Sequence, residues 1–174
     1  IAISNYFNGN DILQIDAVKI KELRYGENSH QKASYFSSSN SGIVNAKQLQ
    51  GKELSYNNLN DADAAYNLVM EFEQPTCAII KHANPCGVAI ADNSHQAFSE
   101  AFKVDSKSAF GGIVAINDSV TKELAEDISK IFFEVIIAKS FSAEALEVLS
   151  KKKNLRLLQA DFTSGNEKQI KSIS

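Results

Sequence analysis

A lysine and a histidine stand side by side at the end of an apolar run. Residues 77–80 are small or apolar without alternation, which is typical of a strand buried on both faces. Lys81 and His82 follow directly, and open α/β sheets bind ligands beyond the carboxyl ends of their strands. An ammonium group and a group that titrates near neutrality could act there as charge stabiliser and general base.

The same pair also has a purely structural interpretation. Adjacent side chains on a strand point to opposite faces, so Lys81 and His82 converge only if the chain turns there. Pro85 and Gly87, just downstream, favour such a turn. Without it, the pair is a surface lysine beside a hydrogen-bonded histidine. The residues alone leave both interpretations open.

Two other positions carry residues that could do chemistry. Arg24 and Tyr25 begin a polar loop, residues 24–31. The planar fork of an arginine suits a phosphate, which makes this loop a candidate anion site; the alternative is a surface loop with a half-stacked tyrosine. Cys86 could be a nucleophile, but no activating base at a determinable position supports that role.

Composition bounds the possible functions. A chain of 174 residues can form one core and at most two small domains. The net charge of −3 does not indicate a nucleic-acid or anionic-membrane surface, and no apolar run approaches membrane-spanning length. The spacing of Cys77 and Cys86 fits no CxxC pair, so we expect no structural zinc and a reducing, cytoplasmic location. The chain starts at Ile1 and its single methionine is Met70, so we expect a piece of a longer protein.

Hydrophobic periodicity predicts the elements that must position these residues. Helical spacing follows Asn60, a suitable N-cap, and ends before Pro75; the expected core face is Ala62, Ala65, Tyr66, Val69 and Phe72. From residue 77 onward strands and helices alternate, which predicts an α/β layered sheet with crossover helices. The expected helix starts are Ser94, Thr121 and Ser142, and the expected strands cover 33–37, 113–116, 134–138 and 155–158.

Four segments, in this order, carry a resemblance to a known family. The sequence is similar to the transformylase half of the bifunctional AICAR formyltransferase/IMP cyclohydrolase family of purine biosynthesis. The matching segments are LRYGENSHQ at 23–31, QGKELSYNN at 50–58, KHANPCG at 81–87 and SAFGG at 108–112. Ser29 and Lys139 stand where the family often has proline, which removes no ligand group.

The resemblance implies an activity and a site. Members of this family move a formyl group from 10-formyltetrahydrofolate, a co-substrate, to the 5-amino group of AICAR, without a required metal. By resemblance His82 is the base and Lys81 its electrostatic partner. The implied substrate-binding residues are Arg24 and Tyr25 at the phosphate end, with Gly111 and Glu134; Asn58, from an Asn pair before the first helix, is a further expected contact.

The resemblance also implies a domain organisation. We expect residues 1–16 to be a junction after a cyclohydrolase domain, residues 17–162 to be the first half of the transformylase domain, and residues 163–174 to be a polar tail. The implied fold is cytidine-deaminase-like. The zinc motif of deaminases is missing, because His82-Ala83-Asn84 lacks the glutamate and Pro85-Cys86 lacks the second cysteine.

The implied partners are the AICAR nucleotide and folate, with a homodimer in the full-length enzyme and no nucleic acid or membrane. The folate groups are expected outside this chain, which alone should not turn over substrate. Two alternatives remain. One is a non-catalytic nucleotide-binding module on the same scaffold, although such a module has little need of Lys81 and His82. The other is a relative of the zinc deaminases.

Overall fold

The computed structural model describes residues 16–38 and 42–162. The predicted junction up to residue 15 and the predicted tail at 163–174 lie outside these described residues. Within them, no helix is long and apolar enough to cross a membrane.

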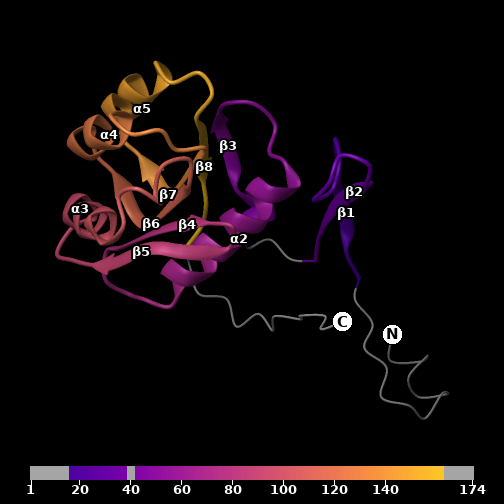
Figure 1. The fold of residues 1–174 in the computed structure, drawn as a ribbon, viewed down its shortest axis with the longest axis horizontal. Coiled ribbons are helices and arrows are strands. Elements are labelled where there is room, and N and C mark those ends of the chain that lie inside the picture. The colour runs from indigo at the N-terminus through magenta and orange to yellow at the C-terminus, as the bar shows by residue number, and fades with distance from the viewer. Residues whose placement is uncertain (1–15, 39–41, 163–174) are drawn as a thin grey trace, which may run out of the picture.

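The described residues form an α/β structure (Figure 1). The strands are β1 (Val18–Leu23), β2 (Ala33–Ser37), β3 (Lys47–Gln50), β4 (Thr76–Lys81), β5 (Asn84–Ile90), β6 (Ile113–Val120), β7 (Val135–Phe141) and β8 (Arg156–Gln159). The helices are the short 3-10 helix η1 (Ile43–Asn45) and α2 (Tyr56–Met70), α3 (Ser94–Val104), α4 (Lys122–Ser129) and α5 (Ala143–Ser150). The predicted α/β class is therefore confirmed.

One mixed six-stranded sheet is the centre of the molecule, with the strand order β3-β8-β7-β6-β4-β5. Strands β6, β7 and β8 are parallel, and α4 and α5 are the crossover helices between them. Strand β4 runs antiparallel to both of its neighbours, β5 and β6. The predicted crossovers are thus correct for α4 and α5. Helix α3 leads from the edge strand β5 to β6, on the other side of β4.

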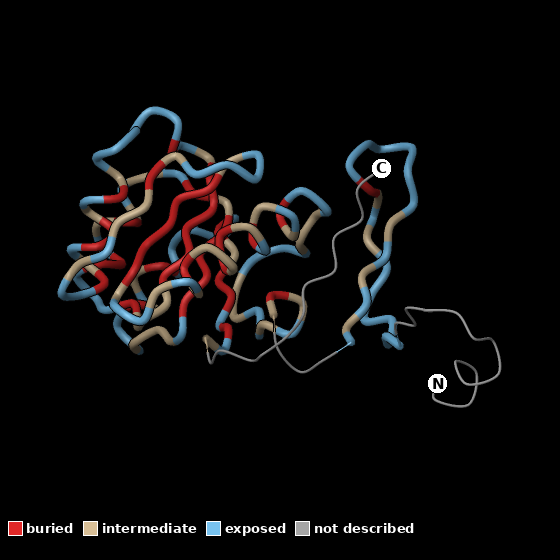
Figure 2. The backbone as a smooth tube through the Cα atoms, turned by 90° about the horizontal axis from the view of Figure 1, so that it is seen from below, coloured by how far each residue is buried: buried red, intermediate tan, exposed pale blue. Residues whose placement is uncertain are grey.

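The central strands are buried on both faces, as the unbroken apolar runs predict. Cys77 and Ile79 of β4 pack in the core under α3, α4 and α5. Ala78 and Ile80 pack on the opposite face, against α2 and η1. Figure 2 shows the buried residues gathered along these strands. The result is a sheet with one helix layer on each side, and it fixes where β4 ends.

The helix starts are set by side-chain caps. Thr121 and Ser142 are the N-caps of α4 and α5, as predicted. The predicted start of α2 at Asn60 is wrong, because Ser55 caps that helix and forms a reciprocal capping box with Asn58. The cap of α3 is Asn93, one residue before the predicted Ser94. The predicted core face of α2 is correct up to Val69, whereas Phe72 lies beyond the helix.

Pro85 and Gly87 do not form the predicted turn themselves, because both residues lie inside β5. Strand β5 is at the edge of the sheet, where proline is tolerated, and the pairing register shifts beside it. Gly87 is required for packing: an added Cβ would lie 2.0 Å from the Ala101 carbonyl oxygen of α3. The turn predicted at Lys81 and His82 is nevertheless present directly after β4, where His82 and Ala83 form it.

Strands β1 and β2 form a separate antiparallel hairpin. Figures 1 and 2 show it at the side of the layered body, with most of its residues exposed or half-buried. An ion pair of 2.6 Å between Lys21 of β1 and Glu53 links it to the segment before α2. The hairpin therefore brings the loop at residues 24–31 next to the N-terminus of α2.

Candidate functional site

The site is built on a tight turn between β4 and β5. Lys81 pairs with Asn84, so the loop consists of His82 and Ala83 alone. Both have positive φ angles, 54° and 57°, as the two central residues of a type I′ hairpin turn require. Neither is glycine, and the left-handed conformation costs a residue with a side chain about 1–2 kcal/mol. The bend required to bring Lys81 and His82 together is therefore present, in a strained form.

Two side chains hold this turn. Asp61, from the second turn of α2, accepts hydrogen bonds from two successive backbone amides: those of His82, at 3.1 Å, and of Ala83, at 2.8 Å. On the other side, the Asn84 side-chain amide donates to the His82 carbonyl oxygen at 2.7 Å. The backbone of His82 is thus tied at both ends.

Lys81 and His82 both line one cavity of about 380 Å³. The Lys81 ammonium group donates to the Phe110 carbonyl oxygen at 2.9 Å, which directs it to the loop that carries Gly111. The His82 side chain is exposed, and within the described residues its imidazole makes no hydrogen bond. An imidazole that makes no hydrogen bond to the protein can accept a proton from a molecule bound in the cavity.

Three more of the predicted residues line the same cavity, each from a different element. Glu134 precedes β7, Asn58 is in the first turn of α2, and Gly111 precedes β6. The full lining is Glu27, Asn57, Asn58, Asn60, Asp61, Lys81, His82, Gly111, Ile113 and Glu134. The volume is within the usual range of small-molecule sites, and the polar groups converge in it.

Asn58 and Glu134 act as a unit. The Asn58 side-chain amide donates to a Glu134 carboxylate oxygen at 2.7 Å, and its oxygen accepts from the Ser55 backbone amide at 3.2 Å. Asn58 is only 5% exposed. Its polar atoms are therefore already hydrogen-bonded within the protein. Its contribution to the cavity is to orient the Glu134 carboxylate.

Glycine is needed at each of the two positions Gly111 and Gly112, at the cavity edge, for a different structural reason. Gly111 has a φ of 76° and donates its amide to the Phe132 carbonyl oxygen at 2.8 Å; this conformation favours glycine. At Gly112, an added Cβ would lie 2.9 Å from the Ile80 carbonyl oxygen. The pair lets this loop close against the end of β4, where Lys81 and His82 begin.

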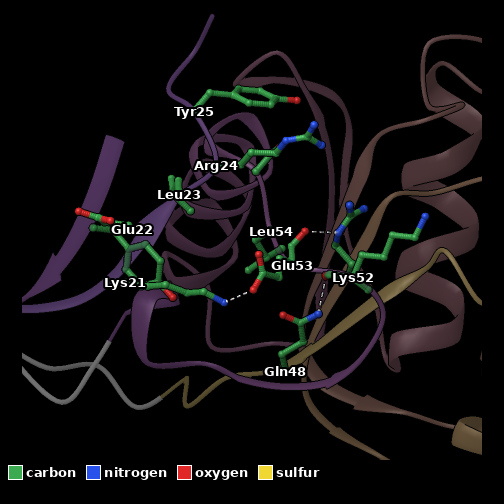
Figure 3. A pocket seen from close by; sticks show the side chains of 12 residues that line it. Lys21, Glu22, Leu23, Arg24, Tyr25, Gln48, Lys52, Glu53 and Leu54 are labelled. Atoms are coloured by element: carbon green, nitrogen blue, oxygen red, sulfur yellow. Dashed lines mark hydrogen bonds and ion pairs between the residues drawn. The ribbon is translucent and has the colours of Figure 1, made fainter. Parts of the chain in front are cut away.

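Arg24 and Tyr25 line a second cavity, of about 360 Å³ (Figure 3). The Arg24 guanidinium lies 5.9 Å from the centroid of the Tyr25 ring, within reach of a cation–π contact. This cavity is lined by four cationic side chains and two carboxylates: Lys21, Arg24, Lys52 and Arg156, with Glu22 and Glu53. The structure therefore does not bring Arg24 and Tyr25 into the cavity of His82.

The two cavities are neighbours across the start of α2. Ser55, its N-cap, lines the second cavity, whereas Asn57 and Asn58 line the first. The loop after β1 likewise reaches both, because Arg24 lines the second and Glu27 the first.

Comparison with known proteins decides the family. The family model described as "AICARFT/IMPCHase bienzyme" matches residues 1–174. The chain belongs to this family.

Relatives within the AICARFT/IMPCHase family are similar along nearly the whole chain. "Bifunctional purine biosynthesis protein PurH" of Bacillus cytotoxicus is 47% identical over 182 residues, with 98% of this chain and 36% of the relative covered. The protein of the same name from Staphylococcus saprophyticus is 49% identical over 176 residues, with 99% and 34% covered. In Roseobacter denitrificans the identity is 58% over 144 residues, with 80% and 27% covered. The chain thus spans about a third of the length of these curated relatives.

Two solved structures show a weak resemblance to this AICARFT/IMPCHase family member. A formate dehydrogenase accessory protein of Desulfotalea psychrophila, itself described as putative, matches with a TM-score of 0.42 and 14% identity, over 48% of this chain and 38% of that one. Acinetobacter baumannii RibD matches with a TM-score of 0.44 and 12% identity, over 56% of this chain and 35% of that one. Similarity at this level carries no argument about function.

The Cys86 thiol of this AICARFT/IMPCHase chain is not activated as a nucleophile by its surroundings. Burial raises the pKa of the half-buried Cys86 thiol, and the negative charge of Asp105 raises it further. Such a thiol is mostly protonated and a poor nucleophile at neutral pH. Within residues 16–38 and 42–162, no cluster of three or more His, Cys, Asp or Glu side chains could hold a metal ion.

Sequence reasoning missed Asp61 in this AICARFT/IMPCHase chain. The sequence places Asp61 directly after the expected N-cap, Asn60, where a carboxylate has an ordinary explanation in the helix dipole. With α2 beginning at Tyr56, Asp61 lies in the second turn and is free to reach the β4–β5 turn. The usable signal was the Ser55-x-x-Asn58 spacing, which marks the true helix start.

Proposed function

We propose that this chain is the nucleotide-binding part of an AICAR formyltransferase, within a bifunctional enzyme that also carries IMP cyclohydrolase. The reaction would transfer a formyl group from 10-formyltetrahydrofolate to the 5-amino group of AICAR, in purine biosynthesis. Membership of the AICARFT/IMPCHase family supports this assignment. The single observation that carries it is the convergence of Lys81, His82, Gly111 and Glu134 on one cavity.

The chemistry needs what this cavity offers. The 5-amino group of AICAR is a weak nucleophile, because its lone pair delocalises into the imidazole and the carboxamide. As the amine attacks the formyl carbon, His82 takes the amine proton and the carbonyl oxygen becomes an oxyanion. The Lys81 ammonium stabilises this negative charge. When the C–N bond to the folate breaks, the proton passes from His82 to the departing nitrogen.

The remaining predicted residues have binding roles in this proposal. Glu134, oriented by Asn58, accepts a hydrogen bond from the nucleotide. Gly111, which has a positive φ and no side chain, lets the nucleotide approach the backbone closely. Arg24 and Tyr25 bind the phosphate end; the excess of cationic side chains in their cavity supports this role. A nucleotide held by all of these residues would cross the N-terminus of α2, where one end of each cavity lies.

We also infer the wider context. Residues 17–162 are proposed as the first half of the transformylase domain, on a cytidine-deaminase-like scaffold without zinc; the mixed sheet with helices on both faces supports this assignment. The folate groups and a homodimer interface are assigned to the complete enzyme, because the relatives are about three times longer than this chain.

Substitution of the proposed base tests the function. In the complete enzyme that carries this chain, His82→Ala should lower the turnover number of formyl transfer by about two to four orders of magnitude, the usual cost of losing a general base. Lys81→Met should also lower it, through loss of oxyanion stabilisation. The measurement is the rate of tetrahydrofolate formation at saturating AICAR.

The matched control is His95→Ala, since His95 pairs with Asp127 on the far helix layer, at 2.7 Å. The control should keep wild-type turnover. A near-normal turnover number in His82→Ala would end the assignment of His82 as the base.

A further inference from the structure

We propose that Asp61 is a positioning residue for formyl transfer: its carboxylate holds the His82–Ala83 turn in the left-handed conformation that presents the imidazole to the cavity. This inference rests on the proposed function and goes beyond it, since it assigns a role to a residue outside the family motifs. Asp61 does not act on the substrate in this account. It acts through the backbone of His82.

The contacts of Asp61 have the form of a clamp. Its two oxygens accept from two successive amides, with Oδ2 on His82 at 3.1 Å and Oδ1 on Ala83 at 2.8 Å. A carboxylate that binds two neighbouring N–H groups fixes the orientation of both peptide planes. These two amides belong to the only residues with side chains that have positive φ in the described part of the chain.

The turn needs such a clamp because its sequence does not favour its shape. Two-residue hairpins of this kind prefer Asn-Gly or Asp-Gly, which adopt positive φ readily. Histidine is tolerated in the left-handed region, but Ala83 has neither the freedom of glycine nor a polar side chain that could bond to its own backbone. Without Asp61, the chain would gain by relaxing at Ala83, and the relaxation would rotate the His82 side chain.

The origin of the clamp explains why it can position a catalytic group. Asp61 is carried by α2, whose Ala62, Ala65 and Val69 are fully buried against the sheet. The same helix carries Asn58, which orients Glu134. A single rigid helix therefore sets the base through Asp61 and the acidic substrate ligand through Asn58. Misplacement of a reacting group by about 1 Å can cost about 10²-fold in rate.

The test compares Asp61→Ala with a rescue by glycine, in the complete enzyme. Asp61→Ala should lower the turnover number by about 10- to 100-fold while the KM for AICAR stays within about threefold, because the clamp positions the base and binds no substrate. Adding Ala83→Gly should restore most of the lost turnover, because glycine adopts the left-handed conformation without help. Asp61→Asn, which keeps one accepting oxygen, should lie between wild type and Asp61→Ala.

Three further measurements make the interpretation specific. Asp63→Asn, the same change two residues along α2, should leave turnover unchanged. The pH dependence of turnover in Asp61→Asn should keep its midpoint, since the role is geometric. In the wild type, amide hydrogen exchange at Ala83 should be slower than in Asp61→Ala, which reports on the clamp without any assay of activity. Circular dichroism checks that the variants are folded.

Each failure has a separate meaning. Wild-type turnover in Asp61→Ala, beside an inactive His82→Ala, would overturn this inference and leave the proposed function standing. A large rise in KM that Ala83→Gly does not reverse would also overturn it, because Asp61 would then contact the substrate. Full activity in His82→Ala would remove the proposed function, and this inference with it.

Discussion

At the scale of single residues, the site depends on two strained positions and the groups that hold them. His82 and Ala83 make the bend between β4 and β5, and without it Lys81 and His82 would point to opposite faces of the sheet. The sequence predicts that a turn is needed, but not which residues form it. Proline and glycine are common in turns, but here both residues lie in a strand. Pro85 is tolerated because β5 is an edge strand, and Gly87 allows close contact with α3.

The position of the Lys-His pair at the end of a strand was predictable, because the pair follows an apolar run that is typical of a buried strand. The clamp from Asp61 was not. Asp61 is separated from His82 and Ala83 by 21 and 22 positions in the sequence. Neither local propensity nor hydrophobic periodicity predicts a contact over such a separation. The same holds for the 76-residue separation between Asn58 and Glu134.

Cys86 gives a prediction at this scale. Since burial and the charge of Asp105 raise its thiol pKa above the ordinary value of 9.0, the reactive thiolate forms at higher pH than in a free thiol. Alkylation of Cys86 by iodoacetamide should therefore be slower than that of free cysteine at pH 8, and its rate should keep rising with pH beyond the point where free cysteine levels off.

Removal of the thiol is the companion experiment. Cys86→Ala in the complete enzyme should keep the turnover number within about twofold of wild type, because the proposed direct formyl transfer needs no covalent intermediate. Cys77 is fully buried and should remain unlabelled in the folded protein. Cys86→Ala is the blank for alkylation measured on the peptide that contains residue 86. Loss of activity in Cys86→Ala would reopen the cysteine as a catalytic group.

At the scale of elements, two helix layers fix the ends of the strands that carry the site. Strand β4 is held between both layers, because its residues alternate between the two cores. Cys77 and Ile79 pack on one face of the sheet, and Ala78 and Ile80 pack on the other. Most elements after residue 77 follow from periodicity and caps, as at Thr121 and Ser142. Strand β5 does not, because tertiary packing against α3 overrides the local preference of its proline and glycine.

Gly87 offers the sharpest test of that packing. In Gly87→Ala the new Cβ would meet the Ala101 carbonyl oxygen at 2.0 Å, so β5 and α3 must move apart. The free energy of unfolding should fall by about 1–3 kcal/mol, the usual cost of an overpacked contact, or by more. Urea denaturation of the variant and the wild type measures it.

Gly42→Ala is the matched control for this prediction. At Gly42 no heavy atom lies within 4 Å of an added Cβ, although its φ of 83° strains any side chain. Its cost should therefore be only that of the backbone, about 1–2 kcal/mol, and smaller than the cost of Gly87→Ala. Equal destabilisation by both substitutions would show that the β5–α3 contact yields easily, and that the glycine at position 87 is not needed for packing.

At the scale of the whole molecule, the chain spans about a third of the length of its AICARFT/IMPCHase relatives. Arg24 and Tyr25 lie in a cavity separate from that of His82, on a hairpin at the side of the layered body. Sequence motifs predicted that both pairs serve one nucleotide, but motif order along a chain does not determine distance in space. The proposed phosphate role of Arg24 therefore requires a nucleotide that reaches across the start of α2.

A crystal structure of the complete enzyme with bound AICAR nucleotide is the most direct test of the central claim. We predict that the 5-amino group lies within hydrogen-bond distance of the His82 imidazole, about 3 Å, with the Lys81 ammonium on the side where the formyl oxygen would lie. A nucleotide bound with its amino group away from an imidazole that faces the protein interior would contradict it.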